Sequence, residues 1–464
     1  MNDAQRIQKI DAFIEENRDA LLRDLKTLVD INSVQSAAQP GAPFGPGVRK
    51  ALDTALEMAR RFGLDAHDCE GYMGYAEIKG ESEKQIATIA HLDVVPEGNG
   101  WDSDPFSMVE REGFVIGRGT ADDKGPAVLT LYAAKFFKEQ GQPLPYTLRI
   151  LLGCAEETGM EDVDYYLANY PQPAFCFTPD GEFPVGYGEK GHYGGTFTSA
   201  PLTGNLVQME GGVATNVVPD RAFAVVKADK DQLADTDRVK VTSEGEGLVR
   251  ITGYGKGGHA SLPEGTVNAI ALVVDYLLEH NLCSAEEKRF LELEHALLSV
   301  TDGSFAGIDC QDEVFTPLTC IGGTVAMKDG RLCQTIDIRY PTCITAETMQ
   351  EKLNAFAAGY GAVFEGEKPA IPFYIDPNSA AIRTLIDTYN EVTGQNKKPF
   401  TMGGGTYARH FANAVSFGME EPEEPVPDFV GAMHGANEGV PVARLLQSLK
   451  IYILALARLM ELEF

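Results

Sequence analysis

The chain has 464 residues, more than one ordinary hydrophobic core holds, so we expect at least two domains. Hydrophobic residues make up 44% of it and charged residues 23%, as is usual for folded globular proteins. The formal net charge of −29 argues against nucleic acid or an anionic membrane surface as a partner, because both attract clustered Lys and Arg.

No apolar stretch approaches the roughly 20 residues that cross a bilayer. The N-terminal pattern is typical of a polar amphipathic helix rather than a secretory signal. The eight cysteines include no Cys-x-x-Cys pair, so neither a zinc ribbon nor a thioredoxin-like redox site is indicated. Cysteines in apolar runs, such as Cys154 and Cys176, are expected to be buried reduced thiols. We therefore expect a cytoplasmic protein.

The residues up to Gly63 predict two helices. Apolar residues recur at helical spacing from Ile7 to Leu25, and a second pattern covers residues 48–62. A Gly/Pro-rich loop, residues 39–47, separates them. Beyond Gly63, strand and helix patterns alternate, which is typical of an α/β sheet.

Three short apolar runs each end at polar residues suited to catalysis. Each run has the length of a buried strand, and active sites of open α/β sheets gather beyond the carboxyl ends of the strands. The runs are residues 86–90, followed by His91 and Asp93; residues 147–153, followed by Glu156 and Glu157; and residues 174–178, followed by Asp180. Because the arrangement recurs three times, we expect these side chains to share one site.

A helix is predicted over residues 124–138, with Pro126 in its first turn and Gly141 beyond its end. Asp122 and Asp123 come directly before it. An Asp often caps a helix, but one cap needs only one Asp. The pair therefore indicates a function besides capping.

Between about residues 189 and 376 the pattern changes to strand-like segments with two intervening helices. Helical patterns resume after it and end in a strongly apolar helix at residues 445–462. We therefore predict an α/β fold with a mixed sheet, interrupted by an inserted α+β domain. The predicted catalytic domain comprises residues 1–188 and 377–464, and the inserted domain comprises residues 189–376.

A hydrolase with two divalent metals needs oxygen and imidazole ligands, a carboxylate that can bridge, and a base that binds no metal. Within the adjacent pair, one glutamate could bind metal while the other takes a proton from water and passes it to the leaving nitrogen. Asp93 could orient His91, although an Asp in a turn after a strand looks the same. The candidate set is His91, Asp122, the pair Glu156 and Glu157, Asp180 and His434.

Five motifs occur in the order typical of a known metallopeptidase family. They are His-Leu-Asp at 91–93, Gly-Arg-Gly-Thr-Ala-Asp-Asp-Lys-Gly at 117–125, Glu-Glu-Thr-Gly at 156–159, Pro-Asp at 179–180 and Met-His at 433–434. Over essentially its whole length the chain thus resembles the family of acetylornithine deacetylase, succinyl-diaminopimelate desuccinylase, aminoacylase and glutamate carboxypeptidase. Further motifs resemble the dipeptidase V type of bacterial dipeptidases and carnosinases: Trp-Asp-Ser-Asp-Pro-Phe at 101–106, Gly-His-Ala-Ser at 258–261, Asp-Ile-Arg at 337–339 and Gly-Gly-Gly-Thr-Tyr-Ala-Arg at 403–409.

The resemblance implies a dinuclear metallopeptidase whose Glu156 is the general base for a metal-bridging water. Asp122 would bridge the two ions through its carboxylate and form a cis peptide with Asp123, and Asp93 would orient His91. We expect zinc, with manganese or cobalt as alternatives. The implied ligands are His91, Asp122 and Asp180 for one ion, and Asp122, Glu157 and His434 for the other.

The dipeptidase branch implies hydrolysis of unblocked dipeptides. The inserted domain is larger than the compact dimerisation lid of typical members, so we expect it to act as the lid of a monomer. The resemblance implies that His259 contacts the transition state, as an oxyanion-stabilising imidazole would, and that Asn216 and Arg339 hold the substrate. Arg339 could grip a free carboxylate with two hydrogen bonds, although a surface salt bridge would also explain it.

Arg409 and the backbone at Gly404 could bind a carboxylate as well, although a tight turn also explains the glycines. Two other functions stay open. An N-acyl amino acid deacylase would use the same metal ligands. A catalytically inactive binding protein on the same fold is disfavoured, because the base and every ligand are present together.

Overall fold

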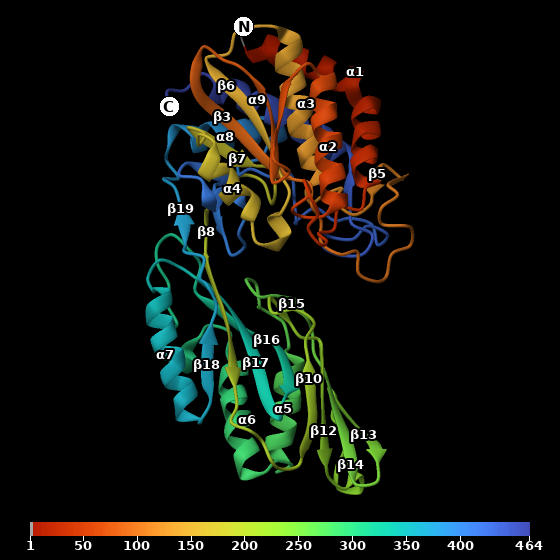
Figure 1. The fold of residues 1–464 in the computed structure, drawn as a ribbon, viewed down its shortest axis with the longest axis vertical. Coiled ribbons are helices and arrows are strands. Elements are labelled where there is room, and N and C mark those ends of the chain that lie inside the picture. The colour runs from red at the N-terminus through yellow and green to blue at the C-terminus, as the bar shows by residue number, and fades with distance from the viewer. Residues whose placement is uncertain (1–2) are drawn as a thin grey trace. The chain divides into compact units, whose positions relative to one another are not determined.

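The computed structural model describes residues 3–464, which form two compact units, each with its own sheet and hydrophobic core (Figure 1). The first unit comprises the residues up to Tyr187, Tyr374–Phe400 and Gly405–Phe464. The second comprises Gly188–Phe373 and Thr401–Gly404. The sequence prediction gave the last of these segments to the catalytic domain. The structure assigns it to the second unit, where the Met402 carbonyl accepts a hydrogen bond from Lys190 N (2.9 Å).

The first unit is built on a mixed sheet with strand order β1-β2-β6-β3-β7-β21-β8-β19, in which β20 also pairs with β8. Strands β6, β3, β7 and β21 run parallel, and β2 joins β6 antiparallel. The strands are β1 (Asp65–Cys69), β2 (Met73–Ile78), β3 (Ser82–His91), β6 (Tyr146–Gly153), β7 (Phe175–Thr178), β8 (Gly186–Glu189), β19 (Phe373–Tyr374), β20 (Phe400–Met402) and β21 (Ala414–Ser416), with a small separate sheet of β4 (Val109–Arg111), β5 (Phe114–Ile116) and β22 (Gly439–Pro441). The mixed α/β architecture predicted from the sequence is confirmed.

Helices cover this sheet and complete its core. Figure 1 shows α1, α2 and α3 beside one another along the strands, and α9 packs on α1, α3 and α8. Helix α3 is buried almost all round because it lies between the sheet and other helices, and Gly141 ends it in a left-handed conformation (φ 61°). The helices are α1 (Asp3–Val29), α2 (Pro46–Arg61), α3 (Lys124–Gln140), α4 (Glu161–Asn169), α8 (Ala380–Thr393) and α9 (Val442–Leu459), with short 3-10 turns η1 (Glu156–Thr158) and η4 (Tyr407–His410).

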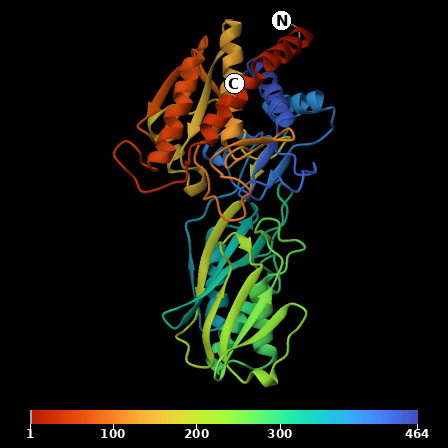
Figure 2. The same ribbon diagram turned by 90° about the vertical axis from the view of Figure 1, so that its right-hand side faces the viewer.

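The second unit is an antiparallel sheet with order β13-β14-β12-β10-β16-β17-β9-β18, against which α5, α6 and α7 pack (Figures 1 and 2). Asn268 caps α5, and Ser284 with Glu287 forms a capping box on α6. The elements are β9 (Gly191–Thr198), β10 (Leu206–Gly211), β12 (Arg221–Lys227), β13 (Val239–Gly245), β14 (Leu248–Tyr254), α5 (Ala269–Glu279), α6 (Ala285–Leu298), β16 (Thr319–Lys328), β17 (Arg331–Tyr340), α7 (Ala346–Gly359) and β18 (Val363–Gly366), with the two-stranded pair β11 (Val217–Val218) and β15 (Gly258–His259) and the 3-10 turns η2 (Lys230–Gln232) and η3 (Ser304–Ala306).

Two sequence expectations concern cysteines and membrane spans. Cys154 and Cys176 are buried and unpaired, as predicted. Cys310 and Cys343, however, form a disulfide in the second unit, and their separation of 33 residues gave no local sign of it. Among residues 3–464, no helix combines the length and apolar character that crossing a membrane requires.

Candidate metal centre

Three neighbouring parallel strands bring chemically active side chains to one edge of the first sheet. Strand β3 lies between β6 and β7, and His91 is its last residue. Glu156 and Glu157 follow the end of β6, and Asp180 follows the end of β7. The side chains that follow the three apolar runs therefore lie at one edge of the sheet.

Two further candidate ligands come from loops. Asp122 lies just before α3 and is joined to Asp123 by a cis peptide bond, as predicted. His434 lies in the loop before β22 and has a left-handed backbone conformation (φ 61°). All five candidate ligands belong to the first unit.

The five side chains form two groups that share Asp122. Asp122 Oδ1 lies 2.9 Å from His91 Nε2, which is 3.8 Å from Asp180 Oδ2. Asp122 Oδ2 lies 2.8 Å from His434 Nε2, which is 3.2 Å from Glu157 Oε1. Two ligand atoms that share one tetrahedral zinc lie about 3.4 Å apart. Each Asp122 oxygen thus faces a different group, which is the arrangement a bridging carboxylate requires.

The electrostatics of this edge fit divalent cations. Burial raises the pKa of Asp180 to about 7, and the neighbouring Asp122 carboxylate adds to the rise. Burial alone would also raise the pKa of Asp122, but hydrogen bonds with His434 and His91 outweigh it and lower the pKa below its usual range. Within residues 3–464, no Lys or Arg forms an ion pair with the Asp122, Glu157 or Asp180 carboxylate. The donor set therefore fits two divalent cations.

Glu156 follows β6 at the same edge of the sheet. Its carboxylate makes no hydrogen bond or ion pair with another described residue, and burial together with Asp180 raises its pKa well above the usual range. The Asp93 carboxylate accepts the backbone N–H groups of Glu156 (3.2 Å) and Glu157 (3.1 Å). The turn is thereby fixed while the Glu156 carboxylate stays available to accept a proton.

Asp93 also contacts His91, mainly through its backbone. The Asp93 carbonyl oxygen lies 2.9 Å from His91 Nδ1, and a carboxylate oxygen lies 3.5 Å from the same nitrogen. The carbonyl can thus accept the Nδ1 proton and leave Nε2 free to face Asp122. The sequence had instead predicted that the Asp93 carboxylate accepts this proton.

Several positioning residues were not found from the sequence. The Asp123 carboxylate accepts the backbone N–H of His91 (3.0 Å). Asp162 accepts the N–H of Cys154 (2.5 Å) and of Ala155 (3.0 Å), as well as the Tyr407 hydroxyl, and so holds the chain between β6 and Glu156. The second Asp of the pair before α3 was the one available signal.

A buried ion pair ties together the two loops that carry Asp122 and His434. Glu438 Oε2 pairs with Arg118 (2.6 Å), while its Oε1 accepts N–H groups of Gly119, Ala121 and Asp122 at 3.0–3.1 Å. Arg118 also donates to the His434 carbonyl (3.2 Å). Both side chains are fully buried. This pair fixes the backbone on both sides of the shared ligand.

The second unit contains His259, assigned to the transition state, and three residues assigned to substrate binding, Asn216, Arg339 and Gly404. Strand β15, with His259, pairs with β11 directly after Asn216, and the Asn216 carbonyl accepts the Ala260 N–H (2.9 Å). The Arg339 guanidinium donates to both Asp337 oxygens (2.7 and 3.0 Å) and to the carbonyl oxygen of Gly403 (3.3 Å), beside Gly404. Arg339 is therefore already held by a carboxylate of its own unit.

Arg409 belongs to the first unit, on η4. Its guanidinium lies over Gly405, where a Cβ atom would meet Nη2 at 2.6 Å. Gly405 thus leaves space for the arginine, which explains one glycine of the run without a ligand.

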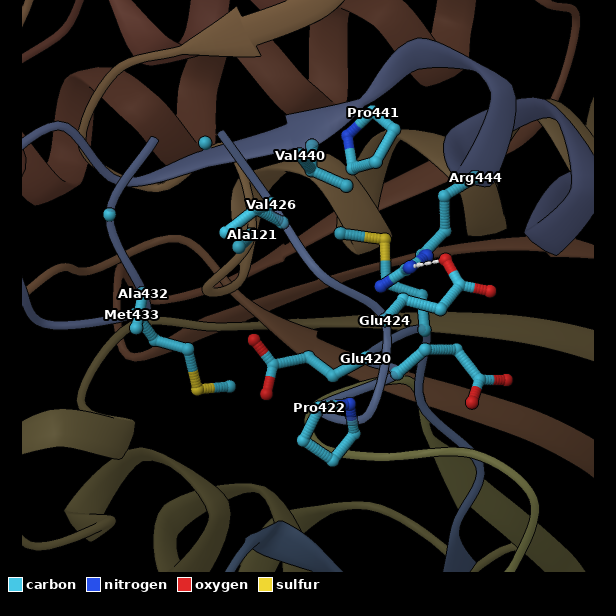
Figure 3. A pocket seen from close by; sticks show the side chains of 14 residues that line it. Ala121, Glu420, Pro422, Glu424, Val426, Ala432, Met433, Val440, Pro441 and Arg444 are labelled. Carbon is cyan, nitrogen blue, oxygen red and sulfur yellow. Dashed lines mark hydrogen bonds and ion pairs between the residues drawn. The ribbon is translucent and has the colours of Figure 1, made fainter. Parts of the chain in front are cut away.

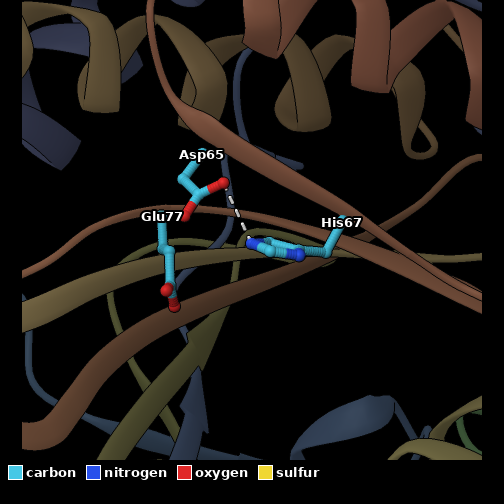
Figure 4. A group of neighbouring side chains, drawn as sticks. All are labelled: Asp65, His67 and Glu77. Carbon is cyan, nitrogen blue, oxygen red and sulfur yellow. Dashed lines mark ion pairs between the residues drawn. The ribbon is translucent and has the colours of Figure 1, made fainter.

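A second cluster of potential ligands, Asp65, His67 and Glu77, lies on β1 and β2 (Figure 4). His67 Nε2 contacts Asp65 (3.1 Å), and its ring stacks on Tyr75. Glu77 Oε2, however, accepts two hydrogen bonds from Arg149 (2.6 and 3.0 Å). Because the only buried carboxylate of the three is engaged in this way, we interpret the cluster as structural.

Comparison with known proteins defines the class. Residues 87–461 match the model of Peptidase family M20/M25/M40, and the chain belongs to this family. A protein of Bacillus subtilis (strain 168) named "Putative dipeptidase YtjP" is 32% identical over 461 residues, covering 95% of this chain and 97% of that protein. The Beta-Ala-Xaa dipeptidase of Lactobacillus delbrueckii subsp. lactis is 31% identical, covering 97% and 98%.

Solved structures show the same fold. The Di-peptidase Dug1p from Saccharomyces cerevisiae superimposes with a TM-score of 0.61 at 15% identity, covering 99% of each chain. Human carnosine dipeptidase 1 gives a TM-score of 0.57 at 14% identity, covering 98% of this chain and 100% of that one. The family resemblance inferred from the ordered motifs is confirmed.

Proposed function

We propose that the protein is a metal-dependent dipeptidase that hydrolyses the peptide bond of unblocked dipeptides. The observation that carries the proposal is the pair of ligand groups sharing Asp122, next to the unpartnered carboxylate of Glu156. Relatives along the full length of the chain carry dipeptidase names, which favours dipeptides over other amide substrates.

The residues divide the work as follows. His91, Asp122 and Asp180 would hold one divalent cation, and Asp122, Glu157 and His434 the other. When bound, the cations polarise the scissile carbonyl and acidify the attacking water. Glu156 accepts the proton of that water and delivers it to the departing amine. Asp93, by holding the backbone of Glu156, keeps the base in place.

The second unit would supply recognition. The His259 imidazole can donate a hydrogen bond to an oxyanion, and Asn216 offers an amide beside it. Arg339 and the backbone at Gly404 offer donors to a substrate carboxylate, and Arg409 is a further candidate. Because Asp337 already accepts two hydrogen bonds from Arg339, the guanidinium is fixed in orientation before any substrate binds.

Three finer assignments belong to the same proposal. Zinc is the expected metal, with manganese and cobalt as alternatives, because all three accept carboxylate and imidazole donors. We propose a monomer, because the inserted domain is large, and a cytoplasmic location.

Reconstitution of the chelated protein tests the function. The protein is stripped of metal, reloaded with zinc, manganese or cobalt, and assayed on Ala-Ala and on N-acetyl-Ala-Ala. We expect metal-dependent hydrolysis of the free dipeptide. Faster cleavage of the N-acetyl bond would instead identify a deacylase, and no turnover of either with two metals bound would identify a binding protein.

A matched pair of variants locates the base. Glu156→Gln should lose at least about a hundredfold in kcat while it still binds two metals, because general-base catalysis contributes about 10²–10⁴. Glu110→Gln changes an exposed glutamate of the same unit and should match the wild type. Unchanged kcat in Glu156→Gln would remove Glu156 from the mechanism.

A further inference from the structure

A cavity of about 370 Å³ opens in the first unit beside the candidate metal centre (Figure 3). Two of its lining residues come directly before candidate ligands: Ala121 precedes Asp122, and Met433 precedes His434. A dipeptide whose scissile carbonyl reaches those ligands can therefore place an adjoining group at this cavity.

The cavity walls combine apolar and acidic side chains. Met419, Met433, Val426, Val440 and Pro441 supply apolar surface. Three glutamates, Glu420, Glu421 and Glu424, also line it. A wall of this kind suits a ligand group with an apolar stem and a polar end.

Two of the three glutamates are already paired. Glu424 forms an ion pair with Arg444, which Figure 3 shows at one side of the cavity. Glu421 accepts hydrogen bonds from Lys397 (2.6 Å) and from the Tyr389 hydroxyl. Neither carboxylate therefore needs an external cation.

Glu420 differs from both. Its carboxylate makes no hydrogen bond or ion pair with any other residue between 3 and 464, and in Figure 3 it points toward the Met433 side chain. The backbone of Glu420 is fixed, because its N–H donates to Gly181 O (3.0 Å) and its carbonyl accepts from Phe183 N (3.0 Å). An unpaired carboxylate is thus held in the cavity by rigid chain.

Among the described residues, the one cation in the cavity lining, Arg444, is paired with Glu424, so Glu420 has no cation of its own. Burial, together with the carboxylates of Asp122, Asp180, Glu182 and Glu438, raises the pKa of Glu420 to about 8. A cationic group bound beside Glu420 would favour its ionised form and pair with it.

We propose that this cavity binds the N-terminal side chain of the substrate and that Glu420 makes it selective for a basic one, lysine or arginine. The inference rests on the proposed dipeptidase function. The methylene stem would lie along the apolar wall and the ammonium or guanidinium would reach Glu420. The C-terminal residue is a poor occupant, because its free carboxylate would lie close to the Glu420 carboxylate. The α-ammonium alone would leave most of the cavity unfilled.

Matched substrates test the pocket. Hydrolysis of Lys-Ala is compared with that of norleucyl-Ala, which has the same stem without the ammonium. We expect the wild type to favour Lys-Ala in kcat/KM by roughly tenfold to a hundredfold, mainly through KM, since a charged hydrogen bond contributes that much. Glu420→Gln should bring this ratio close to one. Glu423→Gln, which alters an exposed neighbour outside the cavity lining, should keep it.

Two outcomes would overturn the assignment: equal wild-type rates on the two substrates, or a loss of the same factor for both in Glu420→Gln, which would place the α-ammonium at this carboxylate. Thermal unfolding of each variant verifies that it is folded. If no dipeptide were hydrolysed, the proposed function would fail on its own. The binding of Lys-Ala and norleucyl-Ala to the metal-loaded wild type and to Glu420→Gln would then be measured by calorimetry. The ratio of the two dissociation constants would test the pocket in place of the ratio of kcat/KM values.

Discussion

Glu438 in the first unit and Glu294 in the second are both buried carboxylates, but only Glu438 is surrounded by hydrogen-bond donors. Glu438 in the first unit accepts three backbone N–H groups and pairs with Arg118. Glu294 on α6 is fully buried, and neither of its oxygens has a hydrogen-bond partner in the described structure. On the same helix, Glu287 accepts N–H groups of Ser284 (2.7 Å) and Leu206 (2.8 Å).

The comparison separates two uses of buried charge. A buried carboxylate with donors on every side fixes backbone, and in the first unit the fixed backbone carries metal ligands. Glu294 has no donors among the described residues and lies in the second unit, which holds no candidate metal ligand, so it lowers stability when it ionises. Removing a partner of Glu438 should therefore weaken metal binding in the first unit. Removing the charge of Glu294 should instead raise the stability of the second unit.

The largest effect is expected at the shared ligand. Asp122→Asn keeps the shape of the side chain but removes the charge that would neutralise two cations. Activity should fall by at least about a thousandfold, because metal-assisted stabilisation is worth several kcal/mol. Bound metal, counted by plasma mass spectrometry, should fall below two per chain. Asp387→Asn, an exposed position on α8, is the control and should retain both metals.

Next in size is the ion pair behind the ligands. Glu438→Gln should weaken metal binding by about 10–100-fold, as loss of a group that positions ligands commonly does. Breaking a buried pair also costs about 3–5 kcal/mol of unfolding free energy. Glu77→Gln breaks another buried pair, with Arg149 on β2 and β6, away from the candidate ligands. It should lose stability but keep the metal affinity measured by competition with a chelator.

If Glu438→Gln bound metals as tightly as the wild type, the pair would have only a structural role. The comparison with Glu77→Gln separates this outcome from general destabilisation, since both variants lose a buried ion pair.

Four of the five candidate ligands lie beside a locally recognisable element and could be predicted from the sequence for that reason. His91 and Asp180 end buried apolar runs, and Asp122 precedes a helix with clear start and stop signals. Adjacency of β6, β3 and β7 follows from parallel packing of buried strands, so the shared edge was also predictable.

Residues that meet only through tertiary structure were not predictable. Arg118 and Glu438 are 320 positions apart, and Asp162 and Tyr407 are 245 apart. The Glu420 cavity is formed by segments around Ala121 and Arg444 as well as its own. No local sequence pattern indicates contacts between residues so far apart in the chain.

A smaller effect is expected from removing the isolated charge in the second unit. Burial raises the pKa of Glu294 to about 8, above its ordinary value of 4.5. The wild type should therefore lose stability relative to Glu294→Gln as pH rises from about 4.5 to 8, by up to about 1.4 kcal/mol per pH unit. Chemical unfolding at pH 6 and pH 8 measures the difference.

Glu292→Gln on the same helix is exposed and should show no such pH-dependent gain. An equal response of the two variants would mean that Glu294 finds a partner on ionisation.

The smallest effect is expected at the start of α6, where the charge is stabilised. The Ser284 hydroxyl accepts the Glu287 N–H (3.2 Å), and the Glu287 carboxylate accepts the Ser284 N–H. Ser284→Ala removes one of these bonds and should cost about 1 kcal/mol of unfolding free energy, as loss of a helix cap does. The loss should be the same at pH 6 and pH 8, because Glu287 keeps its N–H donors from Ser284 and Leu206. A pH-dependent loss would show instead that the Ser284 hydroxyl stabilises the ionised Glu287 carboxylate. The difference between Glu287 and Glu294 would then come from the Ser284 side chain alone.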